Sequence, residues 1–63
     1  MNYGFVVQLV DPLTKKPEWE GSADDLLAAN DGDEGVRDTL DLLNTKEAGE
    51  TLLCGFFWLL RVD

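Results

Sequence analysis

The segment that decides the fold is SADDLLAANDGDEGVRDTLDLLN, which spans residues 22–44. It reads as two short amphipathic helices around an acidic loop that contains glycine. Ser22 is a good N-cap for the first helix, because a serine hydroxyl accepts a hydrogen bond from a free backbone N–H of the first turn. The loop residues Asn30–Gly32 favour a turn and end that helix. A second helix is predicted to begin at residue 33 or 34 and to run to about Thr45.

Each predicted helix has one apolar face, with the spacing that about 100° of rotation per residue requires. Glu34, Asp38 and Asp41 repeat this spacing on the opposite face of the second helix. Both helices are therefore predicted to pack on a core with one side and to meet solvent with the other. The apolar residues are Ala23, Leu26 and Leu27 in the first helix and Val36, Leu40 and Leu43 in the second.

Acidic residues are concentrated in one contiguous part of the chain. Residues 18–41 hold nine acidic residues and a single basic one, Arg37, so this window has a net charge of −8. The whole chain of 63 residues also has a net charge of −8, because its other four acids are balanced by four bases. We predict that this segment binds a partner. Its acidic residues are Glu18, Glu20, Asp24, Asp25, Asp31, Asp33, Glu34, Asp38 and Asp41.

The N-terminal segment Asn2–Val10 alternates in the manner of a β-strand, and the Asp-Pro pair after it favours a turn. One face of this strand is predicted to contain Tyr3, Phe5, Val7 and Leu9. Residues Glu18–Glu20 could form a short second strand that pairs back on the first as a hairpin, and the sequence leaves open whether they do.

The C-terminal segment Glu50–Val62 is predicted to be one continuous strand, after a connector that ends at Gly49. Both of its faces are apolar, which is typical of a strand covered on both sides. The face predicted to pack against the helices contains Leu52, Cys54, Phe56 and Trp58. Two short helices cover only one face of a small sheet, so the other face is expected to form a homodimer or to be buried against a partner. That face is predicted to contain Leu53, Phe57 and Leu59.

Together these elements predict a single α+β domain over residues 1–63. Its small sheet has two or three mainly antiparallel strands, with the first and last as neighbours, and two short helices on one face. A domain of about 60 residues buries only about 60% of its unfolded surface. The chain has one cysteine and no histidine, so neither an intramolecular disulfide nor the commonest zinc sites are available as reinforcement. We therefore expect oligomerisation or a partner to stabilise the fold.

Few residues here suit catalysis. No histidine is present to activate Ser22 or Cys54, and a thiol in an apolar strand is a poor nucleophile. Glu18 and Glu20 flank Trp19, an arrangement similar to a glycosidase acid/base pair beside an aromatic ring that stacks on a sugar. So small a chain, however, offers no cleft deep enough to desolvate a carboxylic acid. Residues 30–41 can be aligned with a calcium-binding loop, but they lack the ligand at its third position and its bidentate glutamate. This favours a solvated acidic turn. We predict that the protein is not an enzyme and uses no metal or cofactor.

The charge balance argues against nucleic acid as a direct ligand and against anionic membranes, because both need a basic surface. The longest apolar run, Leu52–Leu60, is shorter than the roughly 20 residues that span a bilayer. The N-terminal residues lack the basic leader of a signal peptide, and an unpaired cysteine fits a reducing compartment. We therefore predict a cytoplasmic protein of the host cell with a basic protein as its partner.

In size, in its segregated acids and in its lack of catalytic residues, the chain resembles small acidic proteins that imitate nucleic acid and block DNA-binding sites. Many of these proteins are encoded by phages, and anti-CRISPR proteins are the nearest example. The resemblance covers about a third of the chain, chiefly the acids of residues 24–41. It implies an inhibitor of a basic nucleic-acid-binding protein, such as a Cas subunit of a surveillance complex. The alternative is a structural or antitoxin-type (immunity-type) module that binds through the apolar strand Leu52–Leu60.

Overall fold

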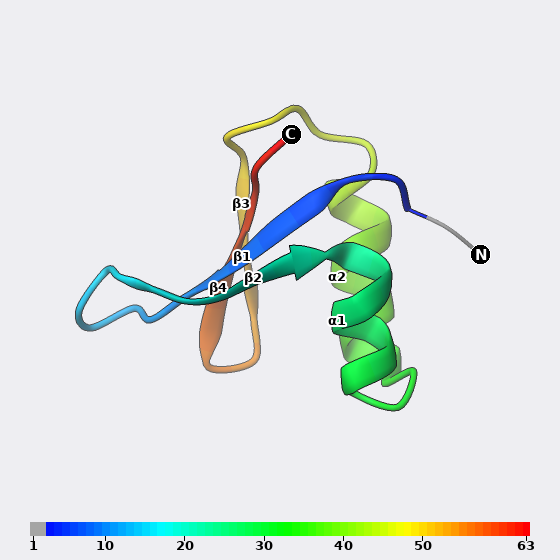
Figure 1. Cartoon of the computed structure of the whole chain (residues 1–63), viewed down its shortest axis with the longest axis horizontal. Coiled ribbons are helices and arrows are strands. Elements are labelled where there is room, and N and C mark those ends of the chain that lie inside the picture. Colours follow the sequence, from blue (N-terminus) through cyan, green and yellow to red (C-terminus); the bar gives the residue numbers. More distant parts are fainter. Residues whose placement is uncertain (1–2) are drawn as a thin grey trace.

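The structure of the chain, a computed structural model, describes residues 3–63. Two strands are followed by two helices and then by two more strands (Figure 1). The elements are β1 (Val6–Val10), β2 (Pro17–Ser22), α1 (Ala23–Ala29), α2 (Glu34–Leu43), β3 (Thr51–Cys54) and β4 (Phe57–Arg61). The fold is α+β, as predicted, and residues 18–20, whose conformation the sequence left open, belong to β2.

The four strands form one antiparallel sheet in the order β2-β1-β4-β3. The predicted pairing of the first and last strands is confirmed, because β1 lies beside β4 with Leu9 opposite Leu59. The prediction of two or three strands was wrong, since the C-terminal segment supplies two strands rather than one. The central pair β1 and β4 is therefore flanked by β2 at one edge and by β3 at the other.

The C-terminal segment is a hairpin in which Gly55 and Phe56 form a two-residue turn. Cys54 and Phe57 face each other across this turn. Gly55 has a φ of +62°, a left-handed conformation that tight hairpin turns require and that glycine adopts without strain. The predicted single strand overlooked this turn, which reverses the alternation of inward and outward side chains in everything that follows it.

Burial shows the consequence of that reversal. Leu59 is fully buried, whereas Phe56 is 67% exposed and Trp58 is 39% exposed. The prediction that Phe56 and Trp58 pack against the helices was therefore wrong. The predicted dimer face was wrong in two of its three members, because Phe57 and Leu59 lie on the covered side of the sheet. Only Leu53, which is 59% exposed, lies on the open side.

The first strand is shorter than predicted. It begins at Val6, and Gly4 before it has a φ of +74°, which interrupts an extended backbone. The predicted grouping of these residues on one face is nevertheless confirmed, and that face points inward: Phe5 and Val7 are buried in the core, and Tyr3 and Leu9 pack against it. Asn2, the predicted first residue of this strand, lies outside the described residues.

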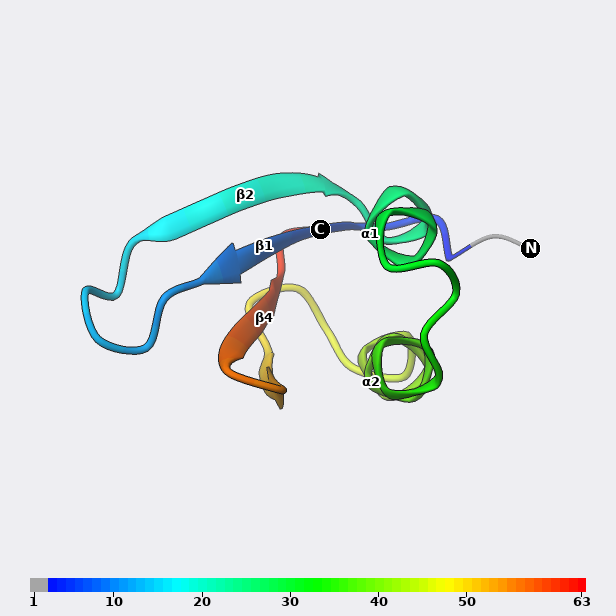
Figure 2. The same ribbon diagram turned by 90° about the horizontal axis from the view of Figure 1, so that it is seen from below.

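Both helices lie on the same side of the sheet and run side by side, as seen almost along their axes in Figure 2. Ser22 caps α1 as predicted, because its Oγ accepts a hydrogen bond of 3.0 Å from the Asp25 backbone N–H. Asp33 caps α2 in the same way, with its Oδ2 3.1 Å from the Val36 backbone nitrogen. The core comprises Phe5, Val7, Ala23, Leu26, Leu40, Leu43 and Leu59.

The covered face of the sheet carries two cross-strand rows that hold the helices. The first row crosses all four strands and consists of Trp19, Leu9, Leu59 and Leu52. In the second row Arg61 lies opposite Val7 and stacks on Phe5, with its guanidinium carbon 4.4 Å from the ring centroid. One guanidinium nitrogen of Arg61 also donates to the carbonyls of Leu43 (3.0 Å) and Lys46 (2.6 Å). Arg61 thus connects the C-terminal end of α2 to β4. Unpaired carbonyls at a helix C-terminus favour a cation.

Candidate partner-binding surface

Seven of the nine predicted partner-binding residues lie on the two helices and on the loop that joins them. Residues 22–44 contain these seven carboxylates and one guanidinium, that of Arg37, so this layer has a net charge of −6. We call it the acidic helix layer, and it contains Asp24, Asp25, Asp31, Asp33, Glu34, Asp38 and Asp41. None of the seven is buried. The apolar stripes beneath them hold the helices on the sheet, so the fold leaves these carboxylates at the surface.

Tyr3 joins the carboxylates of two different helices. Its backbone N–H donates to both oxygens of Asp24 on α1, at 3.2 and 3.3 Å. Its phenol O–H donates to Oδ1 of Asp41 on α2, at 2.8 Å. Asp24 and Asp41 are thereby held near each other although they are far apart in sequence. Tyr3 was not foreseen as part of this surface, because an alternating strand pattern reports which way a side chain points and not which distant carboxylate it meets.

This arrangement changes the acidity of Tyr3. Burial raises the pKa of its phenol, and the hydrogen bond to Asp41 and that residue's negative charge raise the pKa further. The phenol therefore stays protonated at neutral pH and remains a donor to Asp41. Asp24 and Asp41 are thus held by an uncharged backbone N–H and an uncharged phenol O–H, so no cation is part of this bridge.

The other members of the layer differ in how much they contribute to the fold. Asp33 uses one oxygen to cap α2. Asp31 has a φ of +56°, a left-handed conformation that aspartate tolerates better than most residues. Glu34 and Asp38 are exposed on α2, one helical turn apart. These two carry charge without a capping or bridging role, which makes them the residues of choice for testing the surface.

Glu18 and Glu20 are not part of the acidic helix layer. Oε1 of Glu20 accepts a hydrogen bond of 2.9 Å from Nε2 of Gln8, its partner across β1 and β2. This pair lies on the sheet face opposite the helices. Glu18 is exposed at an irregularity in the β1–β2 pairing, where the register shifts between Leu9 and Val10. The structure thus separates these two glutamates from the other seven acids.

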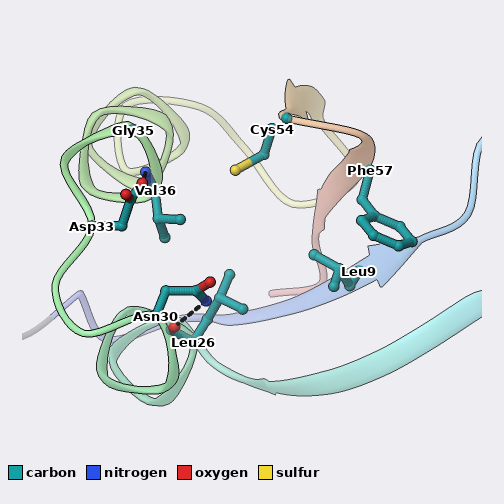
Figure 3. A pocket seen from close by; sticks show the side chains of 9 residues that line it. Leu9, Leu26, Asn30, Asp33, Gly35, Val36, Cys54 and Phe57 are labelled. Atoms are coloured by element: carbon teal, nitrogen blue, oxygen red, sulfur yellow. Dashed lines mark hydrogen bonds between the residues drawn. The ribbon is translucent and has the colours of Figure 1, made fainter.

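An apolar cavity of about 400 Å³ opens between the helices and the C-terminal hairpin. The residues that line it come from α1, α2, β1, β3, β4 and the loops between these elements, and Figure 3 shows the Cys54 side chain pointing toward the helices. Its apolar walls are Leu9, Leu26, Val36, Cys54 and Phe57, and its polar rim contains Asn30 and Asp33. Gly35 and Gly55 complete the lining. The cavity adjoins the acidic helix layer, since Asp33 belongs to both.

The sheet face away from the helices is open and partly apolar. A shallow concavity of about 480 Å³ lies on it, lined by Val10, Pro17, Trp58 and Leu60 among others. Lys15, Gln8 and Thr51 supply its polar groups. We call this surface the open sheet face. It was anticipated in the sequence as an uncovered face, although the residues assigned to it on β4 were wrong.

Within residues 3–63, no three His, Cys, Asp or Glu side chains gather closely enough to hold a metal ion. Neither α1 nor α2 is long and apolar enough to cross a membrane, and no other helix occurs in that range. No protein-family model, curated protein or solved structure matches this chain.

Proposed function

We propose that this protein is a non-enzymatic inhibitor that presents the acidic helix layer to a basic nucleic-acid-binding site and blocks it. The observation that carries the proposal is the gathering of seven carboxylates, from two helices and their loop, at the surface of one helical layer with a single guanidinium among them. Tyr3 adds to it by fixing Asp24 and Asp41 beside each other. A surface that is both preorganised and strongly negative attracts cationic partners and steers their approach.

The spacing of the charges supports a nucleic-acid-like pattern. A rise of about 1.5 Å per residue places Asp38 about 6 Å and Asp41 about 10 Å from Glu34 along the axis of α2. The first of these distances is similar to that between successive phosphates along one nucleic-acid strand. Like charges one turn apart also repel, at a cost of a few tenths of a kcal/mol, and solubility alone does not require that arrangement. The implied partner is a basic DNA- or RNA-binding protein of the host, a Cas subunit being one example.

The decisive experiment compares two variants with the same change in net charge. Glu34→Lys with Asp38→Lys reverses two charges of the layer and changes its net charge from −6 to −2, while Glu47→Lys with Glu50→Lys makes the same change in the exposed connector before β3. Proteins captured from host lysate by the parent and by the connector variant, but not by the layer variant, are identified by mass spectrometry. Each is then tested for release from a labelled DNA duplex when the parent protein is added.

The proposal requires that such a partner release its DNA and that its affinity for the parent fall steeply with salt, because association steered by charge is screened. Both variants should keep nearly the parent's unfolding free energy, since exposed substitutions usually change it by less than about 0.5 kcal/mol. The lysine at position 34 lies at a helix N-terminus and adds a small dipole penalty. A partner that binds the layer variant as tightly as the parent would overturn the proposal.

A second candidate function is a structural or antitoxin-type module that binds through its C-terminal hairpin. The observation that favours it is the exposure of Leu53, Phe56 and Trp58 around one turn. Exposed aromatic residues in a cluster are typical of protein interfaces. In this case Trp58→Ser would abolish capture of the partner, whereas the charge-reversed layer variant would retain it.

A further inference from the structure

The cavity between the helices and the C-terminal hairpin is a feature that neither the core nor the acidic helix layer requires. Leu9 and Phe57 approach it from the sheet, Leu26 and Val36 from the helices, and the Cys54 sulfur points into it (Figure 3). All five are half-buried or buried, so each presents apolar surface that the chain itself does not cover completely. Its volume of about 400 Å³ falls in the usual range of about 300–1,000 Å³ for sites that accept a ligand.

The rim of this cavity presents hydrogen-bond acceptors. Asp33 contributes a carboxylate of which Oδ2 is used for the Val36 N–H, and a carboxylate has acceptor capacity beyond one bond. Asn30 donates from Nδ2 to the Leu26 carbonyl at 2.8 Å, which leaves its amide oxygen as an acceptor. Asp31 and Glu34 flank Asp33 in the chain and add two more negative charges. An occupant must therefore combine an apolar body with cationic donors.

We propose that this cavity receives one large apolar side chain of the basic partner, with arginine or lysine residues on either side of it that pair with Asp33 and its acidic neighbours. The inference rests on the proposed function and specifies the partner: a basic segment that carries a tryptophan, phenylalanine or leucine among its cationic residues. The acids steer the segment, and the buried side chain holds it. Apolar anchors that fill a pocket while charges surround them are the usual source of tight binding.

Charge complementarity selects this occupant over a second copy of the chain. Two copies would bring two surfaces of net charge −6 against each other at the cavity mouth, and like charges in contact are costly. A neutral apolar molecule would fill the walls but leave the exposed rim acceptors to water, with no gain from the negative charge around them. A basic segment with an apolar anchor satisfies both the walls and the rim.

The test uses two synthetic peptides as probes, Lys-Arg-Lys-Trp-Lys-Arg-Lys and the same peptide with alanine in place of tryptophan. Fluorescein labels on both allow dissociation constants to be measured by anisotropy. The parent is expected to bind the tryptophan peptide about tenfold more tightly, since that is the effect of burying one large apolar side chain. The tryptophan peptide, and not the alanine peptide, is also expected to slow alkylation of Cys54 by iodoacetamide.

Variants that fill the cavity test whether the tryptophan of the peptide binds there. Val36→Phe fills the cavity from α2 and is expected to bring the affinity ratio of the two peptides close to one, without weakening the alanine peptide. Leu42→Phe makes a comparable change at an exposed position of the same helix and should preserve the tenfold ratio. Cys54→Leu fills the cavity from β3 and should act like Val36→Phe, which keeps the test sound if one of the two variants folds poorly.

The outcomes separate this inference from the proposed function. Equal affinities of the parent for the two peptides would overturn the cavity proposal, even if the shared affinity is lost in the Glu34→Lys, Asp38→Lys variant and the acidic layer is thereby supported. A tenfold ratio that survives both filling variants would place the tryptophan elsewhere and would also overturn it. Peptide binding that persists unchanged in the charge-reversed variant would instead contradict the role of the acidic layer itself.

Discussion

The two faces of the sheet differ sharply in burial, and two adjacent residues of β4 show the difference. Leu59 points toward the helices and is fully buried, while its chain neighbour Trp58 is 39% exposed on the open sheet face. The covered face has a continuous row of apolar side chains across four strands, whereas the open face mixes apolar residues with Lys15, Gln8 and Glu20. One face is built to hold the fold together, and the other leaves apolar surface available to a partner.

The largest expected effect contrasts the two faces directly. Leu59→Ala removes a fully buried side chain from the centre of the covered row and should lower the unfolding free energy by about 2–5 kcal/mol. Leu53→Ala, the matched change on the open face, should lower it by less than about 1 kcal/mol, because Leu53 already contacts water. Urea unfolding monitored by circular dichroism measures both. Equal losses would mean that the open face is covered in solution, for example by self-association.

A smaller loss is expected where the covered face meets the end of α2. Arg61→Met keeps an unbranched side chain over Phe5 but removes the donor to the Leu43 and Lys46 carbonyls. The loss should be about 2 kcal/mol, since a hydrogen bond that involves a charged group contributes about 1.5–3 kcal/mol. Lys46→Met, which removes an exposed cation from the same region, is the control and should change the unfolding free energy very little. Hydrogen exchange at the last turn of α2 should accelerate in the Arg61 variant only.

A third effect concerns how closely Trp19 lies on the edge of the covered face. A methyl group at Gly21 would lie 2.6 Å from two carbons of the Trp19 ring. Gly21→Ala should therefore displace the ring and cost about 1–3 kcal/mol, as overpacking does. Gly35→Ala in the first turn of α2 is the matched control, because its new methyl group would meet only the Asp33 carboxylate, at 3.2 Å. Fluorescence is measured with Trp58 replaced by phenylalanine, so that Trp19 is the sole tryptophan, and a spectrum unchanged by Gly21→Ala would contradict this packing.

The helices could be predicted from the sequence far better than the C-terminal hairpin, and the reason is physical. Ser22 and Asp33 mark helix starts by local chemistry, and Val36, Leu40 and Leu43 repeat at a period that belongs to helices alone. Gly55 gave only a weak signal, because one glycine inside an apolar run is compatible with an uninterrupted strand and also with a two-residue turn. These two structures differ only in backbone conformation. Missing that turn inverted the assignment of every later residue, since side chains alternate with a period of two.

The candidate site was predictable in its composition and not in its geometry. Charge segregation identified the seven acids of the helix layer, because their positions follow from the helical pattern. Glu20 was separated from them by the pairing of β2 with β1, and Tyr3 was joined to them through contacts between residues far apart in sequence. The cavity was not foreseen either, since it depends on how the hairpin sits against the helices. Such contacts arise from tertiary packing, which no local pattern specifies.

The smallest effect is expected at Tyr3, which links the covered face to the acidic helix layer. Tyr3→Phe removes the phenol O–H that donates to Asp41, and at neutral pH the loss should be less than about 1 kcal/mol because the bond is exposed to solvent. The backbone contact to Asp24 remains in this variant. The substitution therefore removes only one of the two contacts through which Tyr3 joins the helices.

The pH dependence of this small effect identifies its cause. Burial, the hydrogen bond to Asp41 and the nearby negative charges raise the pKa of the Tyr3 phenol above its ordinary value of 10.0. The folded protein thus holds the phenolic proton more tightly than the unfolded chain does, so its stabilising contribution is complete below pH 10.0 and is lost as the pH rises through the folded-state pKa. The unfolding free energy of the parent should fall more steeply than that of Tyr3→Phe in this range, and the lysines, which are shared by both proteins, cancel in the difference. Parallel curves for the two proteins above pH 10.0 would show that Tyr3 does not bridge the helices through a protonated phenol.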